Sequence, residues 1–296
     1  MQLNRKQLLL LGLLTLVWGL NWPVMKLGVT GYPPLTFRVL CIWLGLPVMA
    51  LLMVVRHTPF RIPREKYREV FWLAMTNLVI WNVLIILAVK HLSSGRSAIL
   101  GYTMPIFSAL LGAWFFGARL RLRNWLGVAA AALGVALLLW YEVTHLTGQP
   151  LAVLGALAAA ATWAYGTQRM RNSTIGVPTL TLAFWMMLIT AVLVTLLCVL
   201  LEYPQWQAPS PRTWAAIAYN AVLVFGFAQA AWLTLARTLP PVASTLSVMM
   251  IPILGVFAGA LGLGEVLHWQ DWAAVGLMTV SIASVLAPSR PEGQVL

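Results

Sequence analysis

Long apolar segments constrain this chain more than any other feature: ten runs of about 17 to 23 apolar residues fill nearly all of its 296 positions. About 20 such residues cross a bilayer as an α-helix, because lipid offers no partner to an unbonded backbone N–H or C=O. Composition agrees, since 61% of residues are hydrophobic, 9% are charged and the mean hydropathy is +0.86. We therefore predict an all-α polytopic membrane protein with spans at residues 8–26, 35–55, 70–89, 97–116, 125–141, 151–168, 179–201, 214–235, 242–263 and 269–286.

The first run is interpreted as a span and not as a removable signal peptide. It is too long for one, and it carries Trp18, Asn21 and Trp22 where small residues would mark a cleavage site.

Basic residues are distributed unevenly between the two sides of the predicted membrane. If the N-terminus is cytoplasmic, fourteen Lys and Arg residues fall on the inner side and four on the outer side. The positive-inside rule then predicts a multi-pass protein of the cell inner (plasma) membrane with both termini cytoplasmic. Topology thus explains the net charge of +12, so we expect no nucleic-acid partner.

One segment occurs twice, 147 residues apart, and holds its register without a gap. The matched residues are Ser97 and Ser244, Pro105 and Pro252, Ile106 and Ile253, Gly112 and Gly259, Ala113 and Ala260, Gly117 and Gly264, Leu120 and Leu267, and Trp125 and Trp272. We predict two five-span repeats, residues 1–145 and 146–296, that form one membrane domain. Because five is odd, the repeats are inverted relative to each other, an arrangement typical of secondary transporters whose substrate site lies between the halves.

Several local motifs support a family assignment: residues 18–23 read Trp-Gly-Leu-Asn-Trp-Pro, the repeat prolines recur, and Gly264-Glu265 precedes Trp272. Over nearly the whole chain, the sequence resembles the drug/metabolite transporter superfamily, specifically ten-helix exporters with two EamA repeats. Within it, the chain looks most like the YddG-type aromatic amino acid exporters. The resemblance implies alternating access around a central cavity lined by spans 1, 3, 4, 6, 8 and 9. One departure is Gly117-Ala118-Arg119, where many relatives have an acidic residue after the glycine.

Polar and aromatic residues within the spans are the candidates for binding, because they cost free energy in lipid unless they face the bundle interior or a wet cavity. Aromatic faces suit an aromatic substrate, to which stacking adds about 0.5–1.5 kcal/mol. Other roles remain open: an Asn can bond a neighbouring helix, and Trp often anchors a span end. Arg38, about one turn inside the second span, is expected to snorkel to the outer surface. The predicted substrate-binding residues are Trp18, Asn21, Asn77, Trp81, Asn82, Tyr102, Trp163, Gln168, Gln229 and Ser244.

Pro105 and Pro252 occupy matched positions in spans four and nine. A proline inside a helix removes one hydrogen bond and kinks the chain. We predict that these two kinks act in gating; static bends that only shape the packing are the alternative.

Residues for coupling or catalysis are missing from the centres of the predicted spans. All seven carboxylates and all four histidines fall in loops or near span ends, which favours uncoupled transport driven by the substrate gradient. The chain has no phosphate-binding loop and no His-Glu-x-x-His pair, so we expect no enzyme activity, cofactor or metal. Cys41 and Cys198 are expected to be packing residues.

The predicted function is the export of small metabolites, most of all aromatic and other neutral amino acids, by a monomer in the lipid bilayer. Two alternatives remain open. One is a carrier of drug-like, phosphorylated or nucleotide-linked metabolites, the phosphorylated ones requiring several buried basic residues. The other is an intramembrane enzyme or scaffold.

Overall fold

The computed structural model describes residues 5–116, 122–144, 149–229, 231 and 241–286, and every regular element within these ranges is a helix. The predicted all-α fold is therefore confirmed. Six helical stretches are long and apolar enough to cross a membrane, and two shorter apolar helices accompany them. The long stretches are Leu9–Val29, Pro34–Val55, Arg64–His91, Ser94–Phe115, Pro150–Met170 and Thr179–Gln205, and the shorter helices are Leu122–Leu138 and Met250–Leu263.

Each of the ten predicted spans corresponds to one helix or to a succession of helices. The first half contains α1 (Arg5–Val29), α2 (Pro34–Val55), α3 (Tyr67–Ala74), the π-helix η2 (Met75–Val79), α4 (Ile80–His91), α5 (Ser94–Gly101), α6 (Met104–Phe116) and α7 (Leu122–Thr144). The second half contains α8 (Pro150–Arg171), α9 (Thr179–Glu202), α10 (Pro211–Ala218), the π-helix η4 (Tyr219–Ala228), α12 (Pro241–Leu263) and α13 (Trp269–Leu286).

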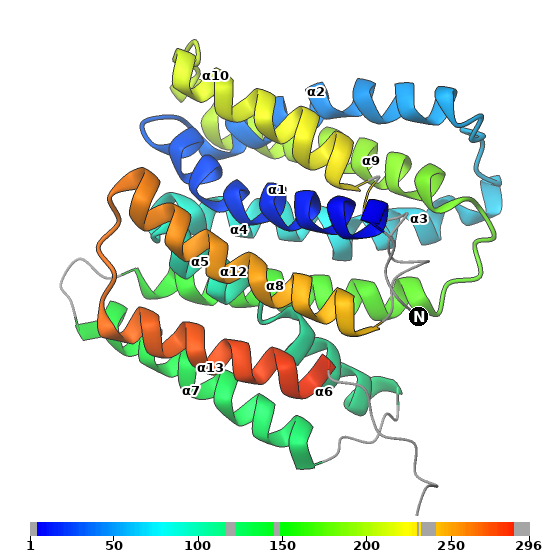
Figure 1. Cartoon of the computed structure of the whole chain (residues 1–296). Helices are drawn as coiled ribbons and strands as arrows, with labels where there is room; N and C mark the ends of the chain where they lie inside the picture. The colour runs from blue at the N-terminus through cyan, green and yellow to red at the C-terminus, as the bar shows by residue number, and fades with distance from the viewer. Residues whose placement is uncertain (1–4, 117–121, 145–148, 230, 232–240, 287–296) are drawn as a thin grey trace, which may run out of the picture.

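The helices run roughly side by side and form one layered bundle (Figure 1). Extensive packing crosses between the two halves: α1 packs on α12, α2 on α9 and η4, and α4 on α8. α7 and α13 pack on each other at one edge of the bundle (Figure 1). Because helices of one half alternate with helices of the other, any site at the centre is built from both.

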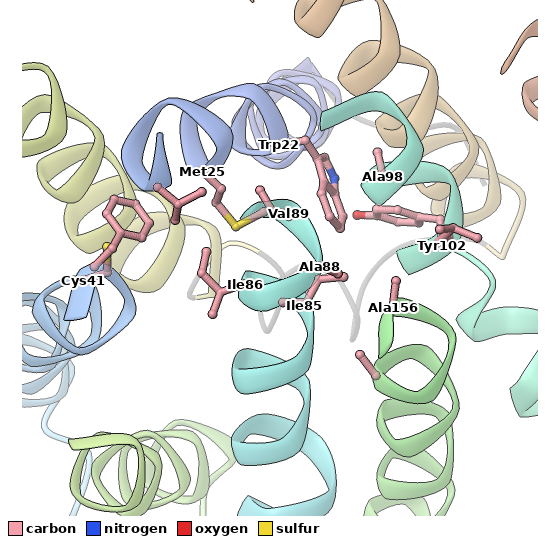
Figure 2. Close-up of a cluster of buried hydrophobic side chains, with 14 of the residues drawn as sticks. Trp22, Met25, Cys41, Ile85, Ile86, Ala88, Val89, Ala98, Tyr102 and Ala156 are labelled. Carbon is pink, nitrogen blue, oxygen red and sulfur yellow. The ribbon is translucent and has the colours of Figure 1, made fainter. Parts of the chain in front are cut away.

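The main buried core lies where α1, α2, α4, α5 and α8 converge. Figure 2 shows Met25 of α1 next to Val89 of α4, with Cys41 of α2 on that side, and Trp22 of α1 beside Ala98 and Tyr102 on the other. The interior of the bundle at this level therefore combines large aromatic and aliphatic side chains.

The two repeat prolines have different surroundings. α5 ends at Gly101 and α6 begins at Met104, so Pro105 lies in the first turn of a new helix after a break at Tyr102 and Thr103. Pro252 lies inside α12, which continues without a break from Pro241 to Leu263. The matched prolines thus give one divided span and one undivided span.

Candidate substrate site

Four aromatic side chains meet near the centre of the bundle, and we call them the aromatic cluster: Trp22, Trp81, Tyr102 and Trp163. The rings of Trp81 and Trp163 stand edge to face, with centroids 4.8 Å apart and planes at 73°. Trp22 and Tyr102 make a second edge-to-face pair at 6.2 Å and 65°. This spacing is the range in which aromatic pairs attract each other. Trp81 comes from α4 and Trp163 from α8, so the first pair joins the two halves.

Gly101 connects the two pairs, because a Cβ added there would meet the indoles of both Trp22 and Trp81. On its other side, the Trp22 indole packs against Gly255 of α12. The helices approach closely at both glycines because neither carries a side chain. Trp81, Tyr102 and Trp163 are among the residues predicted to bind substrate, and the structure brings them together. The structure adds Trp22, which belongs to the motif at residues 18–23 but is not in the predicted set.

Asn77 and Asn82 lie on one span but differ in their surroundings. Each donates its amide N–H to the carbonyl four residues earlier, Asn77 to Leu73 at 3.0 Å and Asn82 to Leu78 at 2.8 Å. The Oδ1 of Asn77 is buried and accepts no hydrogen bond from any described residue. Asn77 is part of the π-helix η2 and packs against Gly166 of α8. π-helical turns are frequent at functional sites, so Asn77 is the stronger candidate of the two.

The remaining predicted residues do not form one group. Gln168 donates its Nε2 to the backbone and side-chain oxygens of Ser108, both at 3.0 Å, and so ties α8 to α6. Trp18 and Gln229 are half-buried, and the Oδ1 of Asn21 is buried without an acceptor role among the described residues. The side chain of Ser244 lies outside the described residues, as do Gly117 to Arg119.

Asn220 is a buried polar residue absent from the predicted set. It repeats the arrangement of Asn77: it lies in a π-helix, η4, donates to Ala216 at 3.1 Å, and has an Oδ1 without a partner among described residues. Asn77 and Asn220 occupy corresponding places in spans three and eight, 143 residues apart. The gapless repeat of spans four and nine, at 147 residues, would pair Asn77 with Val224, so the sequence signal for Asn220 was its place as an amide inside an apolar span.

Arg38 does not reach the surface, which corrects the expectation that it would snorkel. Its side chain is only 3% exposed. Its Nη2 donates to the Met25 sulfur at 2.8 Å, and the guanidinium lies 5.9 Å from the centre of the Phe225 ring. Phe225 comes from η4 of the second half, so this contact is information that the sequence of α2 alone does not contain.

One end of the bundle is bonded across the two halves. We call it the distal end, because it lies opposite the start of α1 (Figure 1). The segments that connect successive helices at this end are residues 30–33, 92–93, 203–210 and 264–268. Glu202 accepts bonds from the backbone N–H groups of Leu35 and Thr36 at 2.9 and 2.7 Å. Glu265 accepts from the N–H and hydroxyl of Ser94 at 2.7 and 2.8 Å. Each carboxylate thus binds a helix N-terminus, where backbone N–H groups lack helical partners.

An ion pair and a lysine add to these bonds. Arg96 Nε lies 2.6 Å from Asp271 Oδ1, and both side chains are almost fully buried. The Arg96 guanidinium also lies 4.0 Å from the centre of the Tyr141 ring. Lys26 donates to the carbonyls of Val89, Lys90 and Leu92 at 2.8–3.1 Å, at the C-terminal end of α4. The bonds of Glu202, Glu265 and the Arg96–Asp271 pair thus tie the two halves together at the distal end, and Lys26 adds a contact within the first half.

A model of one protein family matches this chain twice, over residues 5–140 and 150–287. Its description is the EamA-like transporter family. The chain is 25% identical over 287 residues to the uncharacterized inner membrane transporter YedA of Escherichia coli (strain K12), covering 94% of this chain and 91% of that protein. It is also 25% identical over 294 residues to a probable amino-acid metabolite efflux pump of Salmonella typhimurium, covering 95% and 94%.

A solved crystal structure of another protein shares the fold, with a TM-score of 0.67, 20% identity and coverage of 95% of this chain and 97% of its own. The family match spans nearly the whole chain and falls on both halves. With its apolar spans and helical bundle, this multi-pass membrane protein is a transporter and not an enzyme, and it belongs to the EamA-like family within the drug/metabolite transporters.

Proposed function

We propose that this transporter exports small amphipathic metabolites, above all aromatic and other neutral amino acids, by alternating access. The aromatic cluster supports the proposal more than any other observation. Its Trp81–Trp163 pair joins α4 of the first half to α8 of the second. A substrate in contact with both rings would therefore respond to any movement of one half relative to the other.

The chemistry of the cluster suits a flat apolar side chain. The large indole surfaces can bury the apolar side chain of a substrate. Edge-to-face or offset contacts between aromatic rings add about 0.5–1.5 kcal/mol to the binding free energy beyond that burial. The unpaired Oδ1 atoms of Asn21 and Asn77 supply acceptors on α1 and η2 for a polar group of the substrate. A relative that is 25% identical to this chain is described as a probable amino-acid metabolite efflux pump, which also favours an amino-acid substrate.

We further propose that transport is uncoupled. Proton-driven carriers generally need a titratable group in the transport path. Among the described residues, the buried carboxylates Glu202 and Asp271 and the half-buried Glu265 lie at the distal end and bind helix N-termini or Arg96. They are placed to hold the halves together, and the centre of the bundle contains amides and aromatic rings.

The test is the uptake of labelled tryptophan by purified protein in liposomes, with and without an imposed pH gradient. We expect saturable flux that is equal under the two conditions. Flux only with the gradient would contradict uncoupled transport. Absence of tryptophan flux, together with flux of a drug-like cation or a sugar phosphate in the same vesicles, would overturn the amino-acid assignment.

A further inference from the structure

Arg38 is a buried cation without a carboxylate partner among the described residues. The structure pairs no Asp or Glu oxygen with it within 4 Å, and its Nε has no hydrogen-bond acceptor. The acceptor of Nη2 is a thioether sulfur, which is a weak one. The Phe225 ring at 5.9 Å adds a modest cation–π attraction. The donors of this guanidinium are therefore poorly satisfied.

An arrangement of this kind is costly within a membrane. Removing a charge from water costs several kcal/mol even after relaxation, and a partner with good geometry is needed to offset that cost. Ionisable groups inside spans are accordingly rare and tend to serve substrate or ion pathways. Arg38 therefore calls for a function beyond packing.

The buried and half-buried carboxylates of the described residues that lie at the distal end have other partners. Glu202 binds the N-terminal N–H groups of the same helix, α2, at Leu35 and Thr36. Glu265 binds Ser94 and Asp271 binds Arg96. The protein thus holds its own acids in fixed roles and leaves the Arg38 guanidinium for an anion from outside.

We propose that Arg38 is the carboxylate-binding residue for the transported substrate. This inference rests on the proposed function and adds the group that recognises the charged end of the molecule. In the transport cycle the substrate carboxylate replaces the Met25 sulfur as the acceptor of the guanidinium N–H groups. An unbranched methionine side chain is flexible enough to move aside.

Arg38 is connected to the aromatic cluster through α1. Its contact, Met25, lies three residues after Trp22, so both residues face the same side of α1. Figure 2 shows these two side chains extending from α1 into the same core. Trp22 and Met25 are about one helical turn apart, roughly 5 Å along the axis, so α1 carries both a ring of the aromatic cluster and the present acceptor of Arg38.

The same surroundings favour a carboxylate over a phosphate. A phosphate is usually held by several basic groups. Lys26, on the same helix as Met25, uses its three donors on the backbone carbonyls at the end of α4. One arginine, with two N–H donors in a planar fork, matches a single carboxylate.

The first experiment uses the wild-type chain in liposomes and compares competitors of labelled tryptophan uptake that share the indole ring. Tryptophan and indole-3-propionate have a carboxylate, whereas tryptophan amide and tryptamine do not. We expect the two acids to compete at least about tenfold more strongly than the other two compounds, since charge-assisted hydrogen bonds to carboxylate are the strong ones. Equal competition by all four compounds would overturn the role of Arg38 and leave tryptophan export standing.

The second experiment compares Arg38→Gln and Arg38→Lys with Arg212→Gln, a control that removes a charge from an exposed residue. Arg38→Gln should weaken competition by the two acids about tenfold or more and leave competition by tryptamine unchanged. Arg38→Lys should have an intermediate effect, and the Arg212→Gln control should behave like the wild-type chain. An equal loss for acids and amines would identify a structural role. If Arg38→Gln fails to fold, the competitor series on the wild-type chain decides the question.

A readout that does not depend on tryptophan transport separates the two proposals. Thermal stabilisation of the purified protein by indole-3-propionate, compared with tryptamine, reports carboxylate binding directly. Stabilisation by the acid that is lost in Arg38→Gln, without tryptophan flux, would keep the inference and overturn the amino-acid function. If the acid gave no thermal stabilisation and tryptophan gave no flux, both proposals would be overturned.

Discussion

The ion pair of Arg96 and Asp271 links α5 to α13 at the distal end. Nε lies 2.6 Å and Nη2 3.2 Å from the two carboxylate oxygens, which is the bidentate geometry that makes such pairs strong. Both side chains are below 10% exposed, and Asp271 also accepts from the backbone N–H of His268 at 2.8 Å. Each partner therefore depends on the other to compensate its buried charge.

Removing one partner of this pair should destabilise the protein. For Arg96→Met or Asp271→Leu we expect a loss of about 3–5 kcal/mol in the free energy of unfolding, because the remaining charge is left buried and unpaired. The double variant should recover a large part of that loss. Thermal unfolding of the purified variants measures both effects, and strictly additive losses in the double variant would contradict the pairing.

Trp163 is the residue of the aromatic cluster that the second half contributes. Trp163→Ala should weaken tryptophan binding by about 2- to 12-fold through the lost aromatic contact, with further loss from reduced burial. Trp163→Phe should retain most of the tryptophan binding, because it keeps an aromatic ring at this position. Trp140→Ala is the matched control, since Trp140 is 67% exposed on α7. If Trp163→Ala lowered thermal stability and left flux per folded molecule unchanged, the cluster would be a structural core and not a binding site.

At the scale of the helix, span four and span nine differ although their sequences repeat. Span four is divided at Tyr102 and Thr103 into α5 and α6, whereas α12 is continuous through Pro252. Thr103 bonds its hydroxyl to the carbonyl of Leu100 at 2.6 Å, satisfying one backbone group beside the break. The break lies next to Tyr102 of the aromatic cluster, so a change of angle between α5 and α6 would move the site.

Pro105→Ala should remove the ring that disfavours a helical conformation in the preceding residue, so that α5 can continue into α6 and the break becomes stiffer. We expect tryptophan flux to fall several-fold more than the yield of folded protein, because the hinge and not the fold depends on the proline. Pro252→Ala is the matched comparison within a continuous helix and should have a smaller effect on flux. Equal losses of flux and yield in Pro105→Ala would leave the static bend as the better interpretation.

At the scale of the whole molecule, the bonded distal end would be one of the two states that the proposed alternating access requires. Gly264, with φ of +67°, ends α12 in the left-handed conformation that glycine adopts readily. The chain then turns so that Glu265 reaches Ser94 at the start of α5. The corresponding position of the first repeat, residue 118, is an alanine, so the acid that closes the distal end has no counterpart in the sequence of the other half.

Glu265→Gln should shift the population toward a state open at the distal end, since the amide is a weaker acceptor for the N-terminus of α5. A cysteine at Ser97, which is fully buried behind this end, reports the opening in a background without Cys41 and Cys198. We expect maleimide labelling of residue 97 to be several-fold faster in Glu265→Gln than with Glu265 intact. Unchanged labelling would show that the carboxylate does not control opening.

The orientation of the bundle in the membrane is a separate prediction. The charge asymmetry places both termini in the cytoplasm and the distal end outside. A fluorescent protein that matures only in the cytoplasm should therefore be bright when fused after residue 296. A dark fusion with normal membrane yield would reverse the orientation and, with it, the direction in which the closed end faces.

Much of the architecture could be predicted from the sequence because lipid leaves few options. Ten apolar runs, an internal repeat and the surrounding motifs led to an all-helical transporter, and the helices and family match confirm that prediction. Trp81, Tyr102 and Trp163 could be named as candidates because an aromatic or polar residue inside a span stands out from its neighbours, and their role in binding stays a prediction. Trp22 was not named, although its place one turn after Trp18 puts both on one face of α1 and was a signal that could have identified it.

The tertiary structure alone decided how residues from distant helices are paired. The sequence shows an arginine one turn inside a span, but only the packing of α2 on η4 buries Arg38 beside Phe225 and Met25. The sequence likewise shows carboxylates near span ends, yet only the fold brings Glu202 and Glu265 to the N-termini of α2 and α5. The physical reason is that hydrophobicity acts locally along the chain and is non-directional, whereas hydrogen bonds and charge pairing depend on the positions of atoms that the bundle sets.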